Sequence, residues 1–216
     1  MKTHGSNRLL TGRDMALAAA IAAAMCVTFW LFSSGAELRV TFIPGALVSL
    51  GIIGHLYVRR TPLPLPQRVL PVYMIALAWQ GVHFAEEHAA GFWRDFPVLY
   101  GGQAASTNLF TWFNMTAYAV FSLATVASLV GHVRPLVMPS MFFVVYGCLA
   151  NAISHVTWSV MEGGYFPGLY TGLMYLVIGP VLLRRVWPNS TWRHLAAVVA
   201  TFLVTMVPLE VILAAR

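Results

Sequence analysis

The sequence predicts an all-α integral membrane protein: a seven-transmembrane helical bundle with its N-terminus inside the cell and its C-terminus outside. Hydrophobic residues make up 59% of the 216 positions, and only 9% of the residues are charged. The mean hydropathy is +0.73, which is typical of membrane proteins rather than of soluble domains. We therefore expect a single transmembrane domain over residues 1–216, without a separate soluble module.

Seven apolar stretches are long enough to cross a bilayer, since a transmembrane helix needs about 20 residues. They cover residues 14–33, 40–58, 71–91, 108–131, 135–160, 168–187 and 192–213. The first two form an N-terminal helical hairpin over 14–60, and the other five form a core over 68–216. Between these parts, Pro62, Pro64 and Pro66 predict an extended connection, because each proline fixes its own φ and disfavours helix in the residue before it.

The positive charges predict the orientation, because the short cytoplasmic loops of membrane proteins are rich in Lys and Arg. With the N-terminus inside, ten such residues lie on the inner side: Lys2, Arg8, Arg13, Arg59, Arg60, Arg68, Arg134, Arg184, Arg185 and Arg193. The outer side holds the other three of the 13: Arg39, Arg94 and Arg216. We expect the protein in the cytoplasmic (inner) membrane of a bacterium, with the N-terminus in the cytoplasm.

The positions of the charges also bear on partners. The sequence pI is ≈ 9.7, but the positive charges stand at the ends of the spans, so we expect membrane lipid as a partner and no nucleic acid. The outer loop over 92–107 contains the pair Gly101-Gly102, and we expect it to be flexible enough to act as a lid. The sequence does not indicate an oligomeric state.

Four ionisable residues, His83, Glu86, Glu87 and His88, lie within six consecutive positions of the third span. A charge at the bilayer centre costs roughly 2.5–3.5 kcal/mol even on a lenient scale, so we expect this segment to have a function. His83, Glu86 and Glu87 are spaced i, i+3, i+4 and share one helix face. His88 lies about 140° around the helix from His83 and is expected at the outer mouth.

A second polar pair lies at matching depth on the fifth span. With a rise of 1.5 Å per residue, Glu87 lies roughly 6 Å and His83 roughly 12 Å below the outer surface. His155 and Asn151 then lie roughly 7 Å and 13 Å down. We therefore expect the two pairs to face each other, with the site in the outer leaflet.

Two imidazoles and a carboxylate are typical ligands of a divalent first-row metal. We expect His83, Glu87 and His155 to bind it, with zinc as the first choice and iron as the second. Glu86 is the candidate general base, or else a second carboxylate ligand. Asn151 is a catalytic candidate that orients by hydrogen bonding or acts as a weak ligand. A dinuclear iron or manganese centre is an alternative that the missing Glu-x-x-His pair disfavours.

Four other polar residues lie near the predicted outer ends of the spans. Asn114, Glu162 and His88 are additional candidates for the site. For Asn114 we favour an ordinary hydrogen-bonding role, and for Glu162 solvation of a helix end. Glu210 is expected to extend its carboxylate to the membrane surface.

These residues predict a membrane-embedded metal-dependent enzyme that acts on a hydrophobic or amphipathic small molecule. Metal-bound water and a Glu base would support hydrolysis or another acid/base conversion, and oxidative chemistry is a less favoured alternative. Two non-enzymatic alternatives stay open: a proton or metal carrier, and a protein that binds a lipophilic ligand without turnover.

The motif His83-x-x-Glu86-Glu87, followed by Asn151-x-x-x-His155, resembles the membrane-protein family named after its HxxEE motif. The segment 164–168, Gly-Tyr-Phe-Pro-Gly, is similar to the aromatic-x-Pro-Gly segment of that family. The resemblance covers the third to the sixth span, about half of the chain. The family is largely one of unknown function, so the resemblance supports the site and implies no reaction.

Overall fold

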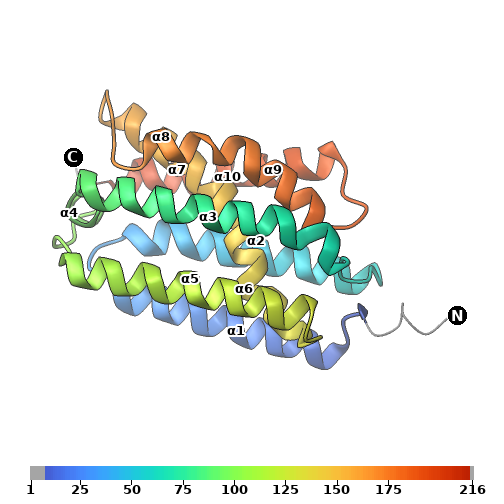
Figure 1. The fold of residues 1–216 in the computed structure, drawn as a ribbon. Coiled ribbons are helices and arrows are strands. Elements are labelled where there is room, and N and C mark those ends of the chain that lie inside the picture. The colour runs from blue at the N-terminus through green and yellow to red at the C-terminus, as the bar shows by residue number, and fades with distance from the viewer. Residues whose placement is uncertain (1–7, 215–216) are drawn as a thin grey trace, which may run out of the picture.

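The protein is described here by a computed structural model, which covers residues 8–214 and shows an all-helical bundle (Figure 1). A helical segment is present at each of the seven predicted positions. Five are single helices: α1 (Gly12–Phe32), α2 (Glu37–Val58), α3 (Pro66–Ala90), α5 (Thr107–Leu129) and α10 (Trp192–Leu213). The other two are composite. One runs through η2 (Arg134–Leu136), α6 (Val137–Phe142), η3 (Phe143–Ala150) and α7 (Asn151–Met161), and the other through α8 (Leu169–Leu173) and α9 (Tyr175–Val186).

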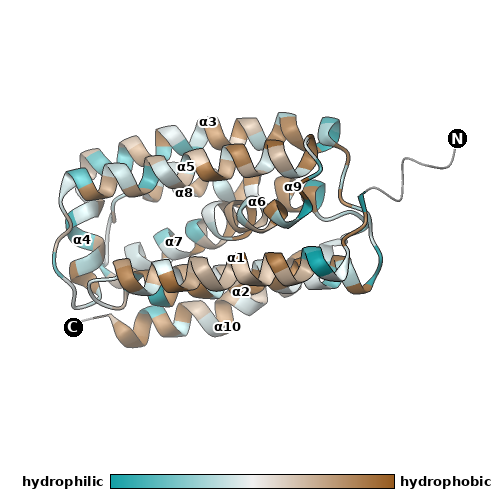
Figure 2. Cartoon of the chain, turned by 90° about the horizontal axis from the view of Figure 1, so that it is seen from below, coloured by the Kyte–Doolittle hydropathy of each residue, from teal (hydrophilic) through white to brown (hydrophobic). Residues whose placement is uncertain are grey.

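Five of these segments are long and apolar enough to cross a membrane: α1, α2, α5, Arg134–Met161 and α10. Their outward faces are apolar, and large side chains such as Leu31, Leu123 and Val204 are more than 70% exposed. Figure 2 shows hydrophobic residues along the sides of the bundle and hydrophilic residues gathered toward its ends. Such a surface suits a bilayer and not water. Lys2 and Arg216, which entered the charge count, lie outside the described residues.

The segment Arg134–Met161 is the central helix of the bundle. It packs against α2, α5, α9 and α10, and most of its residues are buried. Its middle part, η3, is π-helical, and it ends directly before Asn151. Because π-helical turns are frequent at functional sites, the position of η3 indicates that the start of α7 belongs to such a site.

The connection over 61–65 has no regular structure, as the prolines predict, and Pro66 stands in the first turn of α3. The outer loop over 92–107 is more ordered than the flexible segment that we expect from its sequence. Its first half is a helix, α4 (Phe92–Leu99), and its second half is tied to the α1–α2 turn. Gln103 N donates to Ser34 Oγ at 3.1 Å and Ala36 N donates to Tyr100 O at 3.2 Å.

Gly102 in this loop allows close contact between the loop and the α1–α2 turn, and its role is not to make the loop flexible. A Cβ on Gly102 would lie 2.8 Å from the backbone nitrogen of Gly35, so only glycine lets the two turns meet.

The position of Glu210 also differs from the expectation. It is fully buried between α10 and α7, where Ser154 Oγ donates to its Oε1 at 2.5 Å, and so it does not reach the membrane surface.

Candidate metal centre

Three buried side chains from two helices form one cluster. His83 and Glu87 are one turn apart on α3, and His155 comes from α7. Glu87 Oε1 lies 3.3 Å from Nε2 of His83 and 3.3 Å from Nε2 of His155. One ligand atom from each residue lies within 4.8 Å of the other two, a spacing that could hold a metal ion. The two imidazoles are nearly perpendicular, with ring centroids 4.8 Å apart.

Asn151 joins the cluster from the turn of α7 that precedes His155. Its Nδ2 lies 2.9 Å from Nε2 of His83. His83 therefore meets Asn151, and Glu87 meets His155, which is the pairing that the depth argument predicts. Helical spacing explains why: residues four apart lie on the same side of a helix, so two parallel i, i+4 pairs can face each other.

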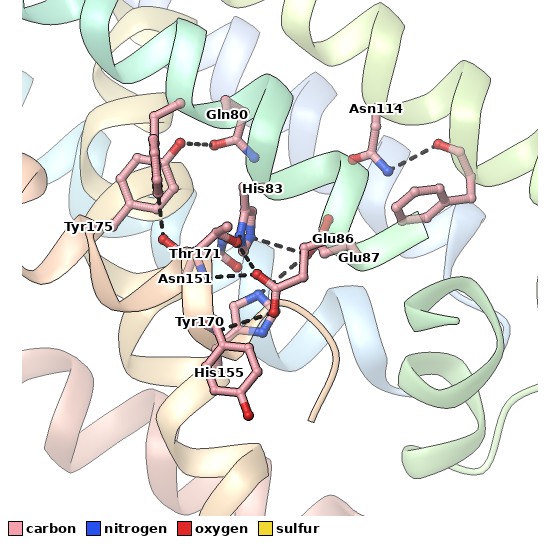
Figure 3. A network of polar contacts seen from close by, with 12 residues as sticks. Gln80, His83, Glu86, Glu87, Asn114, Asn151, His155, Tyr170, Thr171 and Tyr175 are labelled. Carbon is pink, nitrogen blue, oxygen red and sulfur yellow. Dashed lines mark hydrogen bonds and ion pairs between the residues drawn. The ribbon is translucent and has the colours of Figure 1, made fainter. Parts of the chain in front are cut away.

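A threonine outside the predicted site determines which nitrogen of His83 carries the proton. Thr171 Oγ1 donates its single proton to the Glu86 carboxylate, so it accepts from His83 Nδ1, 2.8 Å away. His83 Nε2 then keeps its lone pair, and this lone pair points into the cluster toward Glu87 and Asn151 (Figure 3). This is the tautomer that metal binding through Nε2 requires.

Glu86 does not lie among the cluster atoms, contrary to its predicted role as general base. Its carboxylate accepts from the Tyr165 hydroxyl at 2.8 Å, from Tyr170 N at 3.2 Å, and from both N and Oγ1 of Thr171. Partial burial and contact with Glu86 raise the pKa of Tyr165 to about 12, so the phenol stays a donor. Glu86 therefore holds the start of α8 and positions His83 through Thr171.

His155 is held by packing rather than by hydrogen bonds. Its ring lies against Trp158 and Phe92, with centroids 4.9 Å and 5.5 Å away. Neither ring nitrogen has a well-aligned hydrogen bond among the described residues, although Nε2 faces Glu87. Buried polar atoms are rarely left without a partner, and a metal ion between His83, Glu87 and His155 would satisfy Nε2.

Gly168, in the Pro-Gly segment that opens α8, covers the other face of the His155 ring. Its φ is +90°, and a Cβ there would lie 2.9 Å from Nδ1 and 3.0 Å from Nε2 of His155. The segment is fixed from behind, because Phe166 N donates to Ser159 Oγ at 3.2 Å. Glycine is therefore required at position 168 by both its backbone conformation and the imidazole beneath it.

The other predicted candidates stay outside the cluster. His88 is exposed on α3, and Glu162 is exposed at the end of α7. Asn114 Nδ2 donates to Phe110 O within α5, as expected for an ordinary hydrogen-bonding role. Asn114 nevertheless borders the cavity next to the cluster.

This cavity has a volume of ≈ 70 Å³, and the polar residues on its wall are Gln80, Glu87, Asn114, Tyr146 and Asn151. It is large enough to hold water, which needs a space of only about 10–15 Å³ with polar partners. The remaining lining is apolar and mostly aromatic. A metal held by Glu87 would therefore have an open side toward a small cavity.

Two site residues were missed from the sequence. Gln80 is buried and its Oε1 accepts from the Tyr175 hydroxyl at 2.7 Å. It could have been found, since it stands three residues before His83 on the same face of α3. For Thr171 the sequence gives no signal, because its role depends on how α8 docks against α3.

Comparison with known proteins identifies a family. The family described as "Protein of unknown function with HXXEE motif" matches residues 74–183, which is half of the chain and runs from within α3 into α9. This range contains the cluster, Thr171 and the Pro-Gly segment. No curated protein and no solved structure matches the chain.

Replacing Gly168 with alanine should destabilise the protein more than the same change at Gly163. Both glycines have positive φ, and this conformation costs an alanine about 1–2 kcal/mol. Only at position 168 would the new methyl group also meet His155, since nothing lies within 4 Å of a Cβ at Gly163. Thermal unfolding of the two purified variants measures the difference, and equal melting temperatures would contradict this account of Gly168.

Proposed function

The chain belongs to the HXXEE family, whose function is unknown, and we propose that it is a membrane-embedded metal-dependent enzyme acting on a hydrophobic or amphipathic small molecule. The observation that carries the proposal is the convergence of two buried imidazoles on one buried carboxylate beside a cavity. Two His and one Glu with an open position are a ligand set of catalytic zinc sites. Zinc is therefore the first choice and iron the second.

Each residue would have a defined part in the reaction. His83, Glu87 and His155 would hold the metal, which when bound supplies an activated water or polarises a substrate oxygen. Asn151, in contact with His83 Nε2, would orient the group that enters from the cavity. Thr171 and Glu86 would keep the proton of His83 on Nδ1. This set favours hydrolysis or another acid/base conversion over oxidative chemistry.

A carrier is a weaker candidate, because a carrier needs polar groups along its whole path. The buried residues of the central helix from Val137 to Ala150 are apolar apart from Ser140 and Tyr146. A protein that binds a lipophilic ligand without turnover fits the same site. Turnover of lipid esters or amides by the metal-loaded protein separates this alternative from an enzyme.

We further propose that all seven helical segments cross the membrane, with the N-terminus inside. Hydrogen bonds join the α1–α2 turn to the loop at 100–103, so α3 returns to the end at which α2 begins. α3 is less apolar than the others because Gln80, His83 and Glu87 face the interior of the bundle. At the opposite end, Trp187 after α9 packs on His55 near the end of α2, with centroids 5.4 Å apart.

Elemental analysis of purified protein tests the metal site. We expect about one equivalent of zinc or iron per chain, as for a mononuclear centre, and its loss in His83→Ala, His155→Ala and the isosteric Glu87→Gln. Glu162→Gln is the control, because Glu162 is exposed and outside the cluster. Wild-type protein that neither contains metal nor takes it up on incubation would overturn the proposal.

Substitution of Thr171 tests the control of the His83 tautomer. Thr171→Val keeps the shape but removes the hydroxyl, so we expect metal affinity to fall by about 10–100-fold, as for other groups that orient a metal-binding histidine. Thr171→Ser keeps the hydroxyl and should retain most of the affinity. Competition with a chelating dye gives both values, and equal affinity of the two variants would contradict the role of Thr171.

Labelling of single cysteines tests the topology. In a chain with Cys26→Ala and Cys148→Ala, we expect a membrane-impermeant thiol reagent to modify Gln103→Cys in intact cells. Asn189→Cys should react only after permeabilisation, since three crossings separate the two exposed positions. If α8–α9 did not cross, both would react from the same side.

A further inference from the structure

Three hollow regions meet at Phe113 on α5. One is the ≈ 70 Å³ cavity beside Glu87 and Asn151. The second is an outer pocket of ≈ 270 Å³ between α2, α4 and α5. The third is a groove of ≈ 520 Å³ between α1 and α5. Phe113 lines all three, so its side chain stands between the surface openings and the polar cavity.

The three regions also share walls on either side of Phe113. Phe42, Phe92 and Asn114 border both the outer pocket and the cavity. Ala117 and Phe121 border both the groove and the cavity. The lining of the groove is apolar except for Thr28 and Thr116, whereas the cavity ends at the carboxylate and amides of the cluster.

The groove is open toward the side of the bundle. Trp112 and Val120, which line it, are 74% and 45% exposed on the outward face of α5. In Figure 2, α1 and α5 lie apart, with α6 visible between them. The outer pocket is bordered instead by the loop residues 103–106 at the end of the bundle, and Gln103 of this loop is hydrogen-bonded to the α1–α2 turn. The groove is therefore the opening through which Phe113 can be approached from the bilayer.

We propose that Phe113 gates a lateral entrance through which a single-chain lipid with a small oxygen-bearing polar end reaches the metal centre. The groove and the outer pocket would hold the apolar chain, and the polar end would enter the cavity toward Glu87, Asn151 and Gln80. The cavity is too small for a bulky headgroup, and together the hollow regions have the volume of a ligand site. This inference rests on the proposed function, because it names the substrate class of the same site.

Photo-crosslinking tests the entrance. The full-length protein in phosphatidylcholine vesicles is irradiated with a diazirine-bearing long-chain fatty acid, and the modified residues are mapped by mass spectrometry. We expect labels in the groove and also on cavity residues such as Phe84 and Phe143. Phe113→Trp should reduce the labelling of cavity residues by about tenfold. The larger side chain overpacks the entrance, and a cost of about 1.4 kcal/mol corresponds to a tenfold change. Groove labels should remain.

Two further variants make the result decisive. Leu123→Trp places a tryptophan on the exposed face of α5, away from the three regions, and should leave all labels unchanged. Phe113→Ala widens the gate and should increase the cavity labels, so the inference can be tested even if Phe113→Trp does not fold. Cavity labels that do not respond to either substitution of Phe113, or their absence in the wild type, would overturn the entrance.

Metal content of the same samples separates this inference from the proposed function. Phe113 lies outside the ligand set, so Phe113→Trp should keep its metal. Metal-free wild-type protein whose cavity labels still depend on Phe113 would overturn the metalloenzyme and leave the entrance standing. Metal-loaded protein without cavity labels would overturn the entrance alone.

Discussion

Glu87 lies inside the bundle with only 4% of its surface exposed, and the groups nearest its Oε1 are two imidazole nitrogens at 3.3 Å. Burying a carboxylate is costly unless it is paired, and a metal ion held between Glu87 and the two imidazoles would pair it. His83 comes from the same helix and His155 from the central helix. Much of the remaining fold can be understood as support for these three side chains.

The supporting residues lie on two segments that differ from simple membrane helices. α3 is not among the five segments that are apolar enough to cross a membrane, because its inward face carries the polar residues of the site. The sixth segment consists of the short helix α8 followed by α9, and its N-terminal part carries two contacts of the site. Gly168 lies over His155, and the backbone of Thr171 donates to Glu86.

The positions of the helices and the pairing of the ligands could be predicted from the sequence, because span length gives depth and i, i+4 spacing gives a common face. Thr171 and the partners of Glu86 could not, because they depend on how the five-residue helix α8 docks against α3. The outer loop was misjudged for a different reason. A glycine in a sequence is compatible with flexibility or with close approach, and only the neighbouring turn at Gly35 decides between them.

The same cluster could in principle serve only to hold helices together, and the hydrogen bonding of its members argues against that. A structural polar network satisfies its own atoms, as the Tyr175 hydroxyl and Gln80 Oε1 do nearby. In the cluster, His155 has no well-aligned hydrogen bond among the described residues, and His83 directs a lone pair toward the same point. A cavity with amide groups adjoins that point. His83 Nε2 already meets the Asn151 amide, so the atoms available to a ligand are the ring nitrogens of His155 and the Glu87 carboxylate beside them. That is the arrangement of a binding centre and not of a packing contact.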